Sequence, residues 1–209
     1  MKISEELYGL SVCGGESKRM GTDKSFLTYF EKEQCYHVVD LLHSDDNDLC
    51  KKVFISCNQV QADTISKEYN VLQDLPKYEN TGPMAALLTA FTHYPDQDFL
   101  VAGCDYPFIT SAILRSFLEQ INGNSIAAAF YNSDNKYEPL LAWYSKESGR
   151  ILKRSFENRE YSLQHFLTKN NAEKYIPANH KVMTSVDTPD EFHAVKLLLD
   201  NQLKNTLLF

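Results

Sequence analysis

The sequence lacks the features that mark several classes of protein. No apolar stretch approaches the roughly 20 residues that a membrane-spanning helix needs. The opening residues, "MKISEELYGL", become charged again before an apolar core forms, unlike a signal peptide. The net charge of −7 also provides no excess of Lys and Arg for a broad nucleic-acid surface. We therefore expect a cytoplasmic protein that binds neither a membrane nor nucleic acid.

The cysteine and histidine patterns give no indication of a metal site. The five cysteines form an odd set without C-x-x-C spacing, which argues against a disulfide framework and a zinc knuckle. The six histidines show no H-E-x-x-H or comparable spacing, so none is predicted to hold a metal or act as a base. We expect reduced thiols that are mostly buried.

The composition is that of an ordinary globular domain. Apolar residues make up 43% of the 209 residues and charged residues 23%, and the chain contains no internal repeat or low-complexity linker. This length is typical of one domain, so we predict a single folding unit over 1–209. Surface loops that could be mobile are expected at 43–48 and 76–83.

Short apolar runs alternate with segments of helical periodicity. Strands are predicted at 7–13, 51–58, 70–74, 98–105, 125–132, 138–145 and 173–178. Helices are predicted at 35–42, 61–69, 83–94, 110–121, 162–167 and 189–203. This alternation indicates an α/β fold, a single three-layer α/β/α Rossmann-like domain with a mostly parallel sheet.

Ligands of such sheets bind beyond the carboxyl ends of the strands. Gly14 and Gly15 follow the first strand, where glycines let a phosphate approach backbone N–H groups, although a structural turn is the favoured explanation of the two glycines alone. Neither G-x-G-x-x-G nor a P-loop is present. Arg19 and Lys24 favour the phosphate interpretation, because they would neutralise a polyphosphate.

Three aspartates are further candidates. Asp105 follows an apolar strand and could bind Mg²⁺, and its alternative role as a helix cap is weakened because Thr110 is the better cap. Asp74 ends another strand and could contact a base or ribose, but a solvated loop aspartate is as common. Asp187, before Pro189, is accounted for by a helix N-cap alone.

Taken together, these segments resemble a known family. "CGGESKRMGTDK" (13–24) resembles the L-A-G-G-x-S-x-R-M-G-x-D-K signature of molybdenum cofactor guanylyltransferases of the MobA type, which have the nucleotide-diphospho-sugar transferase fold. Six further blocks agree in order over nearly the whole chain: "SCN" (56–58), "D" (74), "GPMAAL" (82–87), "CDYPF" (104–108), "EPLLAWY" (138–144) and "DTPDEF" (187–192).

The chain also departs from the family pattern. Cys13 replaces an Ala, Ala86 stands where a Gly is frequent, and Ser185 and Asp187 stand where two Asn are frequent. The last three changes concern the acceptor side more than the nucleotide side. Related cytidylyltransferases show A-A-G and lack the Asp of Asp23-Lys24, so the resemblance favours GTP over CTP.

The resemblance implies an enzyme that transfers GMP from MgGTP to Mo-molybdopterin, with Mg²⁺ as cofactor and transient contact with molybdenum-insertion proteins or target molybdoenzymes. Its implied nucleotide-binding residues are Val12, Cys13, Gly14, Gly15, Lys24, Asn58, Asp74 and Asp105. The implied acceptor-binding residues are Arg19, Gly82 and Asp187; the catalytic residues are Lys24, Arg19 and Asp105, of which Asp105 is the metal ligand. No role falls to Lys18. Alternatives are a molybdopterin cytidylyltransferase, a sugar-phosphate nucleotidyltransferase, and a non-catalytic nucleotide-binding partner in cofactor delivery.

Overall fold

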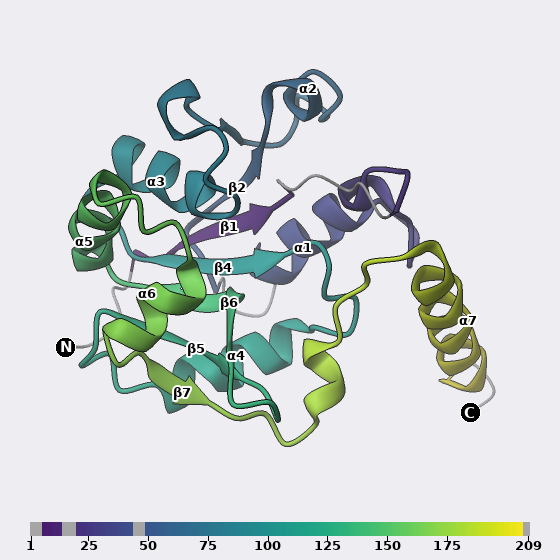
Figure 1. Cartoon of the computed structure of the whole chain (residues 1–209). Helices are drawn as coiled ribbons and strands as arrows, with labels where there is room; N and C mark the ends of the chain where they lie inside the picture. Colours follow the sequence, from purple (N-terminus) through teal and green to yellow (C-terminus); the bar gives the residue numbers. More distant parts are fainter. Residues whose placement is uncertain (1–5, 14–19, 44–48, 207–209) are drawn as a thin grey trace.

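The computed structural model describes residues 6–13, 20–43 and 49–206, with side chains to residue 201. Its strands form one seven-stranded sheet in the order β3-β2-β1-β4-β6-β5-β7 (Figure 1). The strands are β1 Tyr8–Val12, β2 Lys52–Cys57, β3 Val71–Gln73, β4 Phe99–Gly103, β5 Ala127–Tyr131, β6 Tyr137–Tyr144 and β7 Glu173–Tyr175. The helices are α1 Gln34–His43, α2 Gln59–Ala62, α3 Met84–His93, α4 Ser111–Gln120, α5 Lys146–Glu157, α6 Leu163–Lys169 and α7 Pro189–Thr206.

The sheet is mostly parallel, as predicted. Strand β1 pairs in parallel with both β2 and β4, and β2 pairs in parallel with β3. Strand β6 runs antiparallel between β4 and β5, and β7 is parallel to β5. Because β6 is the exception, the six other strands point their carboxyl ends toward the same edge.

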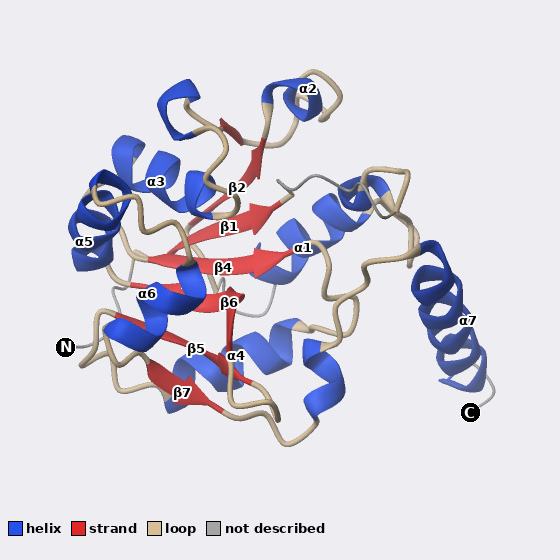
Figure 2. Ribbon diagram, in the orientation of Figure 1, coloured by secondary structure: helices blue, strands red, loops and turns tan. Residues whose placement is uncertain are grey.

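Helices cover both faces of this sheet (Figure 2). Apolar residues of α1 and α4 pack together on one face, and those of α3, α5 and α6 pack on the other. Alternate residues of β1 divide between the faces: Leu10 and Val12 join the α3 side, whereas Cys13 joins the α1 side. Burial on both faces explains why the central strands are apolar without alternation.

Helix α7 lies apart from these layers, at the right of Figure 1. It packs against the segment that follows β1: the rings of Tyr29 and Phe192 are 5.0 Å apart, and Lys196 Nζ donates to the Thr28 carbonyl over 2.8 Å. The C-terminal helix is thereby fixed to the N-terminal part of the chain. Within the part of the chain that the structure describes, no helix is both long and apolar enough to cross a membrane.

One local prediction was wrong. The helix predicted at 61–69 is the single turn α2, after which Ile65 is buried and the ring of Tyr69 stacks on Tyr36 with 4.4 Å between centroids. The segment 76–83 is a largely exposed loop, as expected, in which Tyr78 is buried and its carbonyl accepts a 2.7 Å hydrogen bond from Thr81 Oγ1. The other expected loop falls largely on 44–48, outside the described residues. All five cysteines are free and buried, as expected.

Helix α5 was not predicted from the sequence. Its segment "KESGRILKRSFE" carries a Gly and few apolar residues, although these few recur with the spacing of a helix. The Gly is required by packing, because a Cβ at Gly149 would lie 2.8 Å from Cγ of Phe91 in α3. Helices α3 and α5 approach each other closely only because this side chain is missing.

We therefore expect Gly149→Ala to destabilise the fold. The added methyl would push Phe91 out of its place, which outweighs the better helix propensity of Ala and lowers the free energy of unfolding by about 1 to 2 kcal/mol. Urea denaturation would measure the change. Arg154→Ala, at an exposed position of the same helix, is the control and should change stability by less than about 0.5 kcal/mol.

Candidate functional site

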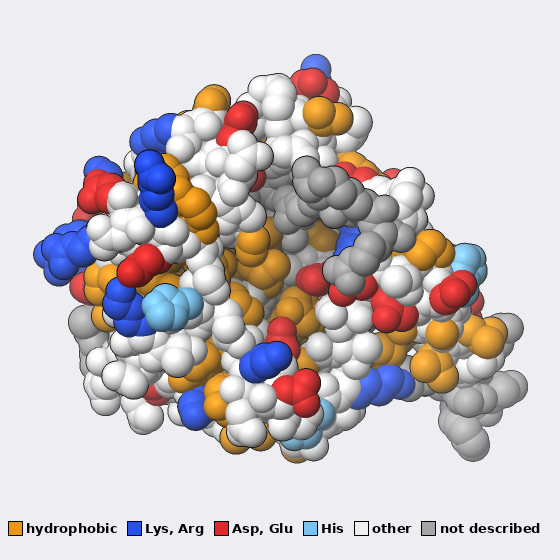
Figure 3. Space-filling view, in the orientation of Figure 1, with side chains coloured by type: hydrophobic (Ala, Val, Ile, Leu, Met, Phe, Trp, Pro, Cys, Tyr) orange, Lys and Arg blue, Asp and Glu red, His pale blue; other side chains and the backbone are white. Residues whose placement is uncertain are grey.

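Four predicted site residues meet at one edge of the sheet. The register pairs Val12 with Ser56 and with Gly103, and it pairs Cys57 with Gln73. The residues just beyond these pairs are Cys13, Asn58, Asp74 and Asp105, from four adjacent strands. Figure 3 shows the surface hollowed beyond the arrowheads that mark the ends of β1 and β4 in Figure 1. The strand ends therefore gather backbone, amide and carboxylate groups around one hollow.

Asp105 is the most unusual of these groups. Its Oδ1 atom is buried and has no hydrogen-bond partner among the described residues. Burial raises the pKa of Asp105 to about 6, and the nearby charges of Asp187 and Glu138 add to the effect while Lys24 opposes it. Gly103 leaves room for the carboxylate, since a Cβ there would lie 2.6 Å from Oδ1. A buried carboxylate oxygen without a donor suits a cation.

Lys24 and Asp187 meet beside Asp105. Their side chains form a partly buried ion pair between the loop after β1 and the segment before α7. The Asp105 carbonyl holds this segment by accepting a hydrogen bond from the Val186 N–H over 3.0 Å. The structure therefore brings together Lys24, Asp105 and Asp187, although Lys24 and Asp187 are 163 positions apart in the chain.

Asp187 does not cap α7, contrary to the simplest interpretation of the sequence. Thr188 caps the helix, because its Oγ1 accepts from the Glu191 N–H over 3.3 Å. Glu191 in turn accepts hydrogen bonds from the N–H groups of Asp187 and Thr188, at 2.8 and 2.9 Å. This capping box leaves the Asp187 carboxylate available to face Lys24.

Gln61 is a site residue that sequence reasoning missed. Its buried Nε2 donates to the carbonyl of Cys13 over 3.1 Å and to Oδ2 of Asp23 over 2.6 Å. Gln61 thereby joins the end of β1, the loop that carries Lys24, and α2. The spacing of Asn58 and Gln61 is that of a capping box, which is the signal that could have indicated it.

Asn58 and Asp74 lie next to each other across β2 and β3. Asn58 Oδ1 accepts from the Gln61 N–H over 2.9 Å, so the carbonyl caps α2 and the amide NH₂ is the part left to reach a ligand. Asp74 Oδ1 accepts from Ser56 Oγ over 3.3 Å. Burial raises the pKa of Asp74 to about 6, and this hydrogen bond only partly offsets it.

Cys13 contributes its backbone to the site and its side chain to the core. Its Sγ lies 3.0 Å from Sγ of Cys104, and its N–H donates to the Ser56 carbonyl over 2.9 Å. Burial raises the pKa of the Cys13 thiol well above its usual value, and contacts with Cys104 and Cys35 raise it further. The thiol is therefore a packing group rather than a nucleophile.

Other predicted residues are placed differently. Gly82 precedes α3 with φ of +60°, a conformation that glycine adopts readily. Helix α3 begins at Met84, one residue after the predicted Pro83. Gly14, Gly15 and Arg19 lie outside the described residues. No group of three or more His, Cys, Asp or Glu residues in the described ranges is arranged to hold a metal.

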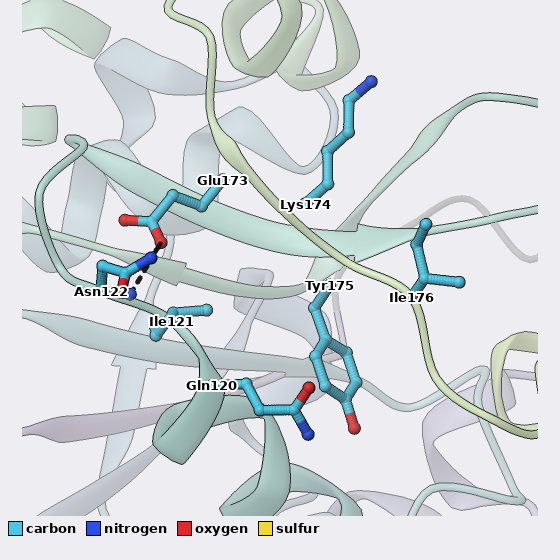
Figure 4. A pocket seen from close by; sticks show the side chains of 7 residues that line it. All are labelled: Gln120, Ile121, Asn122, Glu173, Lys174, Tyr175 and Ile176. Atoms are coloured by element: carbon cyan, nitrogen blue, oxygen red, sulfur yellow. Dashed lines mark hydrogen bonds between the residues drawn. The ribbon is translucent and has the colours of Figure 1, made fainter.

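A separate hollow of about 280 Å³ lies at the far edge of the sheet, between the end of α4 and β7 (Figure 4). Glu173 is its main charged group, but its carboxylate accepts hydrogen bonds from the N–H groups of Asn122, Asn124 and Ser125 at 2.7 to 3.4 Å. Burial would raise the pKa of Glu173, yet these bonds lower it overall. The carboxylate stabilises a turn, and we assign no ligand to this hollow.

The chain is similar to a known protein family and to named relatives. The MobA-like NTP transferase domain matches residues 9–174, which span the whole sheet. "Probable molybdenum cofactor guanylyltransferase" of Flavobacterium johnsoniae is 24% identical over 204 residues, covering 96% of each protein. "Molybdenum cofactor biosynthesis bifunctional protein" of Synechocystis sp. is 31% identical over 140 residues, which are 66% of this chain. The chain matches only 39% of that longer protein.

Solved structures support the same fold. Molybdopterin-guanine dinucleotide biosynthesis protein A of Archaeoglobus fulgidus superposes with a TM-score of 0.75 at 20% identity, over 93% of this chain and 99% of that one. CMP:2-keto-3-deoxy-manno-octonic acid synthetase, solved with CTP, superposes with a TM-score of 0.69 at 11% identity, over 94% and 98%. At these identities the likeness concerns the fold, which is the predicted nucleotide-diphospho-sugar transferase type.

The role of Gln61 can be tested with Gln61→Met, which keeps the length of the side chain and removes its donor. The Cys13 carbonyl would lose a buried hydrogen bond, so we expect the free energy of unfolding to fall by about 1 to 3 kcal/mol. Gln59→Met, at an exposed position two residues earlier, is the matched control. Equal denaturation midpoints of the two variants would contradict the assigned role.

Proposed function

The chain belongs to the MobA-like NTP transferase family and is a nucleotidyltransferase, and we propose that it transfers GMP from MgGTP to Mo-molybdopterin. The products would be the guanine dinucleotide form of the cofactor and pyrophosphate. One observation carries the proposal: the carboxylate of Asp74, after β3, and that of Asp105 beside Lys24, after β4, lie at the same edge of the sheet with β2 and β1 between them. The relative named guanylyltransferase, which aligns over almost its full length, supports the same reaction.

Asp74 and Asn58 would address the nucleoside. Guanine presents N1–H and N2–H₂ as adjacent donors, which match the two oxygens of a carboxylate. Cytosine and adenine present an acceptor at the corresponding ring nitrogen, so a buried Asp74 would be left beside an acceptor. The preference for GTP over CTP would therefore depend on the half-buried carboxylate of Asp74. Binding of cytosine would leave this carboxylate without hydrogen-bond donors, which lowers the affinity.

Lys24 and Asp105 would act at the phosphates. Nucleotidyltransferases of this family generally use a divalent metal, and we propose that Asp105 holds Mg²⁺ through the oxygen that has no protein donor. When bound, Mg²⁺ would supply positive charge to the phosphate oxygens. Lys24 would exchange its partner Asp187 for the triphosphate and stabilise charge that develops toward the leaving pyrophosphate.

The reaction needs little covalent help from the protein. An oxygen of the acceptor's terminal phosphate would bond to the α-phosphorus of GTP, while the bond from that phosphorus to the bridging oxygen of pyrophosphate breaks. A phosphate monoester dianion is already a nucleophile, so no general base is required. Arg19, Gly82 and Asp187 remain the proposed acceptor-binding residues, and Val12, Cys13, Gly14 and Gly15 remain the proposed backbone contacts of the nucleotide.

The direct test is release of pyrophosphate by the purified protein with Mg²⁺, Mo-molybdopterin and either GTP or CTP. We expect release with GTP and at most about a hundredth of that rate with CTP. The reason is that Asp74 would form hydrogen bonds with guanine and would be left without donors beside cytosine. A screen of sugar phosphates as acceptors runs in parallel. Turnover of CTP alone, or of a sugar phosphate in place of Mo-molybdopterin, would refute the proposed substrates.

Asp105→Asn and Lys24→Ala should each abolish most activity. Each removes one preorganised charge at the phosphates, so we expect turnover to fall by at least about 10² to 10³. Asp190→Asn, on the exposed side of α7, is the control and should retain activity. Thermal unfolding would verify that the variants are folded. Native turnover by Asp105→Asn would disprove the assignment of the metal ligand.

Asp74→Asn should weaken GTP binding and reduce the preference for GTP over ATP. Loss of two hydrogen bonds to a charged group predicts a decrease in affinity of about tenfold or more. Because only ionised Asp74 accepts both bonds, this contribution is present above pH 6 and is lost as the pH falls through the raised pKa of about 6. Calorimetric titrations at pH 5 and 8 would measure both effects, with exposed Asp96→Asn as control.

A further inference from the structure

A further cavity lies among the helices on the α3 side of the sheet. It has a volume of about 390 Å³ and lies between α3, α5 and the turn at Tyr78; we call it the α3–α5 pocket. Leu88, Phe91 and Pro95 supply apolar lining. The volume falls in the range that holds small molecules in proteins.

The topology separates this pocket from the strand ends that form the site. Helix α5 begins directly after β6, whose last residue, Tyr144, pairs with Phe99 at the amino end of β4. The α3 residues of the pocket lie in its second half, just before the chain returns to β4. The α3 and α5 residues of the pocket therefore lie toward the amino ends of the parallel strands, and Lys77 and Tyr78 join them from the turn that follows Asp74.

The charge of the pocket is of one sign. Four cationic side chains line it, and no Asp or Glu of the described residues does; the cations are Lys77, Lys146, Arg150 and Lys153. In the described part of the chain, none of the four is in a salt bridge. Figure 3 shows Lys and Arg side chains gathered over α5. Glu147 and Glu157 also belong to α5 but do not line the pocket, so the four lining cations would attract an anion.

The pocket also has rigid walls. Gly149 allows α5 to pack against the ring of Phe91, and the Tyr78 hydroxyl lies 3.1 Å from Thr92 Oγ1, which itself donates to the Leu88 carbonyl over 2.7 Å. Lys77 Nζ lies 4.7 Å from the ring centroid of Tyr78. The apolar lining is therefore held in place by packing and hydrogen bonds, and the four cationic side chains are exposed around it.

We propose that the α3–α5 pocket binds a small anionic ligand with a flat apolar body, of the class of phosphorylated heteroaromatic compounds. The lining formed by Phe91, Leu88 and Pro95 would cover the ring system, and Arg150 and Lys153 would bind the phosphate. The concave shape and the small volume favour a small molecule over an acidic peptide. This inference does not depend on the proposed reaction.

Two matched probes test the two halves of this recognition. Flavin mononucleotide carries a flat ring system and a phosphate, whereas riboflavin lacks only the phosphate. We expect flavin mononucleotide to bind at least about tenfold more tightly than riboflavin, because its phosphate would contact two cations. Fluorescence titration would measure both affinities. Added inorganic phosphate should weaken binding of flavin mononucleotide. Equal affinities for the two probes would overturn the proposal.

Substitutions locate the charge contacts. Arg150→Ala combined with Lys153→Ala should reduce the affinity for flavin mononucleotide about tenfold and leave riboflavin unchanged. Arg154→Ala combined with Lys67→Ala removes the same charge outside the pocket and is the control. Equal losses in the two double variants would mean that only overall charge matters, and would overturn the proposal.

Amide NMR locates the ligand without any variant. Flavin mononucleotide should shift the amide resonances of Thr92 and Gly149, which line the pocket. Shifts confined to Val12, Lys24 and Asp105 would place the probe in the candidate site instead and overturn the proposal. Absence of any shift at millimolar probe would overturn it as well. None of these outcomes depends on whether GTP is a substrate.

Discussion

The pairing of β1 with β2 on one side and β4 on the other is the constraint on which the site depends. Each pair is parallel, and both set Val12 opposite the last residues of its neighbours. Because the strands are buried on both faces, a slip of one residue would exchange the core faces of Leu10 and Cys13, so the register is strongly fixed. The positions of Asn58, Asp74 and Asp105 relative to the end of β1 follow directly from it.

A second set of contacts closes the site from the C-terminal side. Lys24 reaches Asp187, and the Asp105 carbonyl binds the N–H of Val186, so the segment before α7 is attached to the strand ends. The aromatic contact of Tyr29 with Phe192 supports this arrangement from behind. Asp187 gives Lys24 an anionic partner in the absence of a nucleotide, and under the proposed function the negative charge of a nucleotide would compete for it.

Sequence reasoning was most successful where one local rule decides the structure. Asp74 and Asp105 were found because polar residues that follow buried strands lie at the ligand-binding edge of a parallel sheet. The rule failed for Gln61, whose importance depends on a hydrogen bond to a carbonyl 48 residues away. It failed also for α5, because Gly149 lowers helix propensity locally and is tolerated only through its contact with Phe91. Without α5, the α3–α5 pocket could not be anticipated.

Local apolar patterns and ordered motifs were sufficient to predict the fold class, the order of the seven strands in the chain and the family. Which side chains meet depended on the three-dimensional arrangement. It freed Asp187 from helix capping and paired it with Lys24, left Asp105 Oδ1 buried without a donor among the described residues, and assembled four cations around one cavity. The reason is physical: burial and electrostatic contact depend on distances between segments remote in the chain, which no local pattern encodes.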